Sequence, residues 1–171
     1  VSGDADGNGS GDVTVDAAAA VDTTSKSSGL DDERVINLSG SITASVVGLV
    51  GEVDASSLTG LLDVTTLDNS QVDDVKVTTG NKATTIDGFS GDTVTVDARK
   101  LADDTALNLS GDATFEVSAL VGDADITDGS GSATLALGDP SGSGDITIDT
   151  DRETFVDAGL MSSGDTLNIT G

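Results

Sequence analysis

The chain has 171 residues, of which 31 are acidic and 7 are basic, so its formal net charge is −24. This charge argues against nucleic acids and anionic membrane surfaces as partners, because both are bound through basic residues. The sequence contains no Cys and no His, which removes disulfide frameworks, thiolate-bound zinc and the usual general base of enzymes.

The composition favours β-strands and turns over helices. Only four of the acidic residues are Glu; the other 27 are Asp, which favours turns and caps. The apolar residues are mainly Val, Ala, Leu and Ile, with three Phe and no Trp or Tyr. We therefore expect a narrow β core, because wide gaps between layers are usually filled by aromatic side chains.

Two regions differ in their patterns. Residues 1–12 carry Gly and Asp without an apolar period, and we interpret them as an acidic connector. Strand-like alternation begins at Val13, so residues 13–171 are predicted to form one repeat domain, with loop insertions near 18–29 and 83–93. No apolar run approaches the roughly 18 residues of a membrane helix, so no membrane insertion is expected. The chain opens without a signal peptide and begins and ends inside the repeat pattern, which favours an excerpt from a longer protein.

Long internal repeats dominate the domain. Leu38–Gly40 recurs as Leu109–Gly111, a shift of 71 residues, and segment 94–111 recurs as 154–171, a shift of 60. Val-Asp-Ala triplets, each followed by a Leu-rich strand, occur at 15–17, 53–55, 96–98 and 156–158, with Ala-Asp-Ile at 124–126. Without the insertions the triplets lie about 28–32 residues apart, and each unit that starts at a triplet, except the last, holds three strand-like segments.

These intervals predict a right-handed parallel β-helix with three short strands per coil of about 28–32 residues. Gly allows positive φ at the corners, and Asp accepts local backbone hydrogen bonds there. Two-residue hairpin turns between the strands are missing, so each strand is expected to pair with its equivalent one coil away. An antiparallel β-sandwich is the alternative fold, although it offers no reason for a three-strand period.

The central Asp residues of the triplets form the first candidate site. Aligned, they occupy one outward-facing column, in which neighbouring carboxylates would repel by roughly 1 kcal/mol per pair in water. Bound cations such as Ca²⁺ would offset this repulsion and make the column a cation ladder. Alternatively, each Asp caps the turn that follows it. The column consists of Asp16, Asp54, Asp97, Asp125 and Asp157.

The N-terminal segment contains a second candidate metal site. It offers oxygen ligands at positions 1, 3, 5 and 9 of a calcium-type loop and Gly at position 6, but Val15 stands where a bidentate acid is expected. The alternative is a flexible acidic connector. The four ligands are Asp4, Asp6, Asn8 and Asp12.

A second polar column is expected beside the acidic one. Stacked amides hydrogen-bond along a coil axis, so this column has a structural role. Its members are Asn37, Asp63, Asn108 and Asn168.

Segments 91–98, 102–111, 53–60 and 62–66 resemble repeats of very large secreted bacterial surface proteins of the RTX-associated adhesin, surface-fibre or surface-layer type. The RTX nonapeptide itself is absent from the sequence. The resemblance implies an extracellular, non-enzymatic scaffold at the cell surface. We expect self-association into a fibre, filament or surface array, and the alternative is a calcium-dependent adhesin or carbohydrate-binding module. The partners expected are further copies or neighbouring repeats and surface polysaccharide, with Ca²⁺ as the only candidate cofactor.

Overall fold

The computed structural model describes residues 13–16, 21–24, 35–41, 43–67, 74–102, 105–127, 129–138, 145–161, 163 and 165–171. Every element in these ranges is a β-strand. The odd-numbered strands are β1 (Val13–Asp16), β3 (Val35–Gly40), β5 (Glu52–Leu58), β7 (Asp74–Thr78), β9 (Thr93–Asp97), β11 (Thr114–Leu120), β13 (Ala133–Leu137) and β15 (Thr154–Asp157). The even-numbered strands are β2 (Val21–Thr24), β4 (Ala44–Leu49), β6 (Leu62–Thr66), β8 (Thr84–Gly88), β10 (Leu107–Gly111), β12 (Ala124–Ile126), β14 (Asp145–Thr150) and β16 (Thr166–Thr170).

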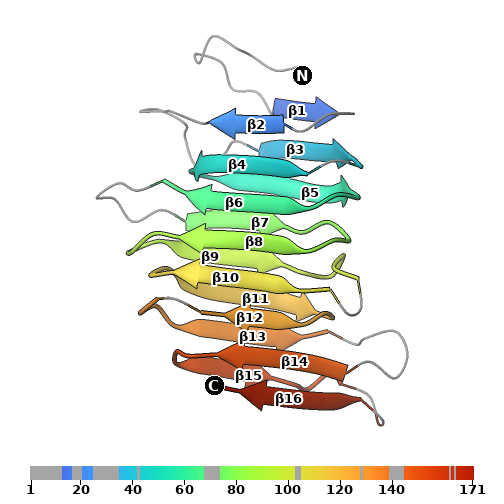
Figure 1. Cartoon of the computed structure of the whole chain (residues 1–171), viewed down its shortest axis with the longest axis vertical. Coiled ribbons are helices and arrows are strands. Elements are labelled where there is room, and N and C mark those ends of the chain that lie inside the picture. Colours follow the sequence, from blue (N-terminus) through green and yellow to red (C-terminus); the bar gives the residue numbers. More distant parts are fainter. Residues whose placement is uncertain are drawn as a thin grey trace.

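The strands form two parallel sheets that face each other across the core. The eight odd-numbered strands make one sheet in chain order, and the eight even-numbered strands make the other. In Figure 1 the even sheet lies in front with its strands pointing left, the odd sheet lies behind with its strands pointing right, and the chain descends from the N-terminus. This winding is right-handed, as in nearly all parallel β crossovers. The predicted all-β parallel β-helix is confirmed.

Each coil contains two strands, one in each sheet, where three were expected. Residues paired across neighbouring strands of one sheet are 17 to 24 apart in sequence, as Val35 with Glu52 and Glu52 with Lys76. The expected period was too long because the triplets from which it was counted lie three or four strands apart, in β1, β5, β9, β12 and β15. The shift of 71 relates β3 to β10, which lie in opposite sheets. This sequence repeat therefore spans seven strands, or three and a half coils.

Both expected loop insertions overlap strands. Residues 83–93 include β8, which pairs with β6 and β10 as a regular member of the even sheet. Residues 18–29 include β2, and the rest of that insertion lies outside the described residues. The expected connector at residues 1–12 also lies outside them.

The core is built from alternate positions of both sheets. In β9, Val94 and Val96 are buried while Thr95 is exposed, and β10 buries Leu107 and Leu109 in the same way. Each fully buried Val or Leu contributes on the order of 1.5–3 kcal/mol relative to an exposed one. The buried side chains are mainly Val, Leu, Ile and Ala, and Phe115 is the one aromatic among the buried residues described.

Glycine is required where the corners of successive coils touch. Gly111, at the end of β10, has φ +84°, and an added Cβ would lie 2.2 Å from the carbonyl oxygen of Gly88. Ala119 adopts a similar left-handed conformation, with φ 55°, at the register shift between β11 and β13. A non-Gly residue in this region is strained, since its Cβ crowds the following carbonyl oxygen.

Arg152 ties three successive corners of the solenoid together. Its Nη1 donates to the carbonyl oxygen of Gly111 at 3.0 Å, and its Nη2 donates to that of Thr127 at 2.7 Å. Its Cζ lies 5.8 Å from the centre of the Phe115 ring, within the range of a cation–π contact. The guanidinium therefore satisfies carbonyls from the corners that follow β10 and β12.

Candidate functional site

Three of the five predicted ladder residues share one column of the odd sheet. Asp54 and Asp97 both pair with Thr78, so a hydroxyl side chain separates the two carboxylates. Asp97 in β9 then pairs with Ser118 in β11. Asp157 in β15 pairs with Ala136 in β13, and β15 lies two coils beyond β11. No two of these acids are paired on neighbouring strands.

The remaining two ladder residues stand elsewhere. Asp125 lies in the even sheet, where it pairs with Asn108 and Asp149. Asp16 pairs with Ser39, and its side chain is outside the described residues. The predicted column of five is therefore wrong, because a two-strand coil assigns the triplets to different sheets and to alternate coils.

Asp97 and Asp157 cap the turns that follow them, which was the structural alternative, and Asp54 makes the same local contact at a register shift inside β5. Oδ1 of Asp54 accepts the backbone N–H of Ser56 at 2.9 Å, and Oδ1 of Asp157 accepts that of Gly159 at 3.0 Å. Asp97 accepts the backbone N–H of Arg99 at 3.2 Å in the same way. An acceptor two residues before the donor is the local geometry that makes Asp favourable at turns.

The calcium-like loop and the predicted polar column have different outcomes. Asp4, Asp6, Asn8 and Asp12 lie outside the described residues. Asn37 belongs to the odd sheet, whereas Asn108 pairs with Thr85 in the even sheet and donates to its hydroxyl at 3.4 Å. Asn168 pairs with Thr147, two positions from the column of Asn108. The predicted amide column is therefore wrong in its membership.

The even sheet carries a mixed polar column instead. It mixes carboxylates with hydroxyl and amide side chains, and Thr170 Oγ1 donates to Asp149 Oδ1 at 3.0 Å. Among the described register pairs, Asp125 with Asp149 is the one that places two acids opposite each other. No group of three or more acids with the spacing of a metal site occurs in the described part of the chain. The column consists of Ser45, Asp63, Thr85, Asn108, Asp125, Asp149 and Thr170.

A shallow groove lies on the outer face of the odd sheet. Lys76 Nζ pairs with Glu52 Oε1 at 2.7 Å, and this hydrogen bond, together with the charge of Glu52, raises the pKa of Lys76. The groove thus combines one ammonium group, carboxylates and two hydroxyls. Its polar lining consists of Glu52, Asp74, Lys76, Thr93, Thr95 and Glu116.

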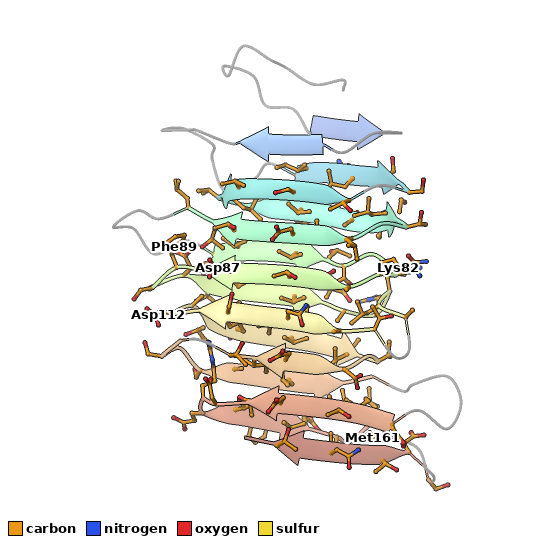
Figure 2. All side chains as sticks on the ribbon, viewed as in Figure 1. Lys82, Asp87, Phe89, Asp112 and Met161 are labelled. Atoms are coloured by element: carbon orange, nitrogen blue, oxygen red, sulfur yellow. The ribbon has the colours of Figure 1, made fainter. Side chains whose placement is uncertain are left out.

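The C-terminal coil, formed by β15 and β16, exposes large apolar side chains, unlike the polar columns and the groove described above. Leu135 and Ile148 of the preceding coil are completely buried, but Ile169, which pairs with Ile148, is 54% exposed. Phe155 and Leu160 are each 66% exposed. Figure 2 shows Met161, which packs against the core, at this same end of the solenoid. The core is therefore uncovered at its C-terminal end.

The backbone of the terminal coil is uncovered as well. In the described sheets, β15 pairs only with β13, and β16 pairs only with β14, so each presents one free strand edge. The exposed apolar residues of this coil were not identified from the sequence. The exposure of Ile169 depends on its position in the stack, because its partner Ile148 is buried one coil earlier. Phe155 is exposed for another reason: it pairs with the exposed Thr134 on the outer face of the odd sheet.

Comparisons with known proteins give no relative. No protein-family model matches the chain, and no curated protein and no solved structure matches it. None of the described residues forms a helix with the length and apolar character needed to cross a bilayer. Function is therefore argued from geometry.

Proposed function

We propose that the chain is a structural module of an extracellular fibre or surface array that assembles by end-to-end stacking of solenoids. The observation that carries this proposal is the regular parallel stacking of the coils, which further copies or neighbouring repeats can continue along β15 and β16, beside Phe155, Leu160 and Ile169. Exposed apolar residues next to an open edge mark a surface for association.

The N-terminal coil supplies the complementary edge. Among the described strands, β1 pairs only with β3 and β2 pairs only with β4, on the side opposite to the edges of β15 and β16. Because all neighbouring strands are parallel, β1 of a second copy can add to β15 and β2 to β16 without reversing direction. Such head-to-tail contact does not close on itself and produces a filament.

The flanks of the solenoid favour growth in one dimension. The described outer positions of the even sheet include Asp63, Asp87, Asp125 and Asp149, with no basic residue among them. Two such faces repel each other, so side-by-side packing is disfavoured while the ends attract. The resemblance to secreted repeats supports a non-enzymatic role outside the cell.

The test compares an end substitution with a flank substitution. Ile169→Asp places a charge on the uncovered coil, whereas Val47→Asp changes a residue that is 40% exposed on the side of the even sheet. We expect the wild-type protein and Val47→Asp to form rods that lengthen with concentration in sedimentation and electron microscopy, and Ile169→Asp to stay monomeric with an unchanged β-sheet circular dichroism spectrum. Wild-type protein that stays monomeric at millimolar concentration would refute end-to-end assembly.

A second function, binding of surface polysaccharide, is favoured by the groove around Lys76. The groove offers hydrogen-bond donors from Lys76, Thr93 and Thr95 and acceptors from Glu52 and Glu116 to sugar hydroxyls. Glycan-array binding that is lost in Lys76→Ala but retained in Lys82→Ala, which changes an exposed lysine at a corner, supports this function. Equal binding by both variants contradicts it.

A further inference from the structure

The charge of the chain is far from balanced within the fold. Lys76 pairs with Glu52 and Arg99 pairs with Asp97, but 7 basic residues cannot neutralise 31 acidic ones. The side chains of both Lys76 and Arg99 are more than half exposed. Exposed pairs of this kind are strongly weakened by solvent and salt, so most of the negative charge stays uncompensated.

Winding into a solenoid fixes the distances between these carboxylates. Neighbouring strands lie about 4.8 Å apart. Asp125 and Asp149 are one strand apart, whereas Asp54 and Asp97 are separated by Thr78 and lie two strands apart, at about 10 Å. The fold thus stacks like charges at short, repeated distances that an extended chain does not impose.

These distances match the range over which salt screens charges. The Debye length is about 30 Å at 0.01 M ionic strength, 10 Å at 0.1 M and 3 Å at 1 M. Repulsion between acids two strands apart is therefore present at 0.01 M and largely screened at 1 M. Even the Asp125–Asp149 pair is weakened at the higher concentration.

We infer that ionic strength controls the stability of this fold, so that the solenoid is stable in saline surroundings and weakened in dilute ones. The controlling variable is screening of the collective negative field. The interleaving of acids with hydroxyls and amides, as in Asp63–Thr85–Asn108–Asp125, spreads the charge along the column and provides no concentrated cluster for one cation. This inference does not depend on filament formation.

The experiment follows thermal unfolding at micromolar protein concentration, where assembly does not contribute. We expect the melting temperature to rise by about 10 °C between 0.01 M and 1 M NaCl, and to rise equally in choline chloride. Sucrose of equal osmolality is the uncharged control for solute effects. A melting temperature that does not change with salt overturns the inference, as does full stabilisation by 1 mM CaCl₂ at low ionic strength, which would indicate a specific site.

Two matched variants test the geometric basis. Asp125→Asn removes one member of the directly opposed acidic pair, and Asp63→Asn removes an acid between Ser45 and Thr85. At 0.01 M salt, Asp125→Asn is expected to raise the melting temperature more than Asp63→Asn, and the difference should vanish at 1 M. Equal effects of the two variants at every salt concentration would show that the register does not control the repulsion.

Discussion

Replacing Arg152 by Ala is expected to loosen three coils at once. The side chain donates two hydrogen bonds to corner carbonyls, at 3.0 and 2.7 Å, and lies over Phe115. Hydrogen bonds from a charged group contribute about 1.5 kcal/mol each at the low end, and the cation–π contact adds about 0.5–1 kcal/mol. Arg152 Nε is buried with no hydrogen-bond partner, and the cost of burying it cancels about 1 kcal/mol of this stabilisation. The net expected loss is about 3 kcal/mol in the free energy of unfolding.

Urea denaturation followed by circular dichroism measures this loss. A change of about 3 kcal/mol lowers the unfolding midpoint by about 1–3 M for m-values of about 1–3 kcal/mol/M. Arg99→Ala is the matched control, because Arg99 is exposed and forms its ion pair with Asp97, two residues away, so its midpoint should stay unchanged. Arg152→Lys keeps the charge but not the planar fork, and should lie between wild type and Arg152→Ala. If Arg152→Ala and Arg99→Ala unfold at the same urea concentration, the argument that Arg152 joins the coils is refuted.

Three further outcomes are expected. Ala119→Gly should raise the free energy of unfolding by about 0.5 kcal/mol in urea titrations, because Gly relieves the strain of φ 55° at some cost in unfolded-state entropy. Gly88→Ala should destabilise by about 2 kcal/mol or more in the same assay, since its Cβ would lie 2.4 Å from that of Ala113. Hydrogen bonds from Ser130 lower the pKa of Asp112, so they stabilise the fold at pH values above the usual carboxyl pKa. This stabilisation disappears as the pH falls through the lowered pKa of Asp112. In Asp112→Asn, the free energy of unfolding should therefore change less with pH over this acidic range.

The fold class was readable from the sequence because its signals are local. Alternation such as Val94-Thr95-Val96 fixes which side chains turn inward, and Gly at corners such as Gly111 marks where the chain turns. The capping role of Asp97 was also accessible, as its acceptor and donor are two residues apart. These interactions depend on neighbouring residues and hardly on the rest of the fold.

The number of strands per coil and the membership of the columns could not be read in this way. Both depend on which sheet each strand enters, and the strand sequences of the two sheets are alike: β3 and β10 share Asn-Leu-Ser-Gly although they lie in opposite sheets. Treating β8 as an insertion then left three strands in an interval that holds four, β5 to β8, so two coils were taken for one. A column of acids was inferred where the true register places Thr78 between Asp54 and Asp97.

The seven-strand repeat has a consequence for how such a rod can change. β3 and β10 have matching sequences although they lie in opposite sheets, so the same strand sequence fits either sheet. One strand with its corner is therefore the smallest unit that can be gained or lost while the core stays continuous. Adding a single unit would turn everything after it by half a revolution. If the unit were added between β6 and β12, Asp63 and Asp125 would lie on opposite sides of the rod. Lineages could thus redistribute surface charge by changing the count of units, without substituting a single exposed residue.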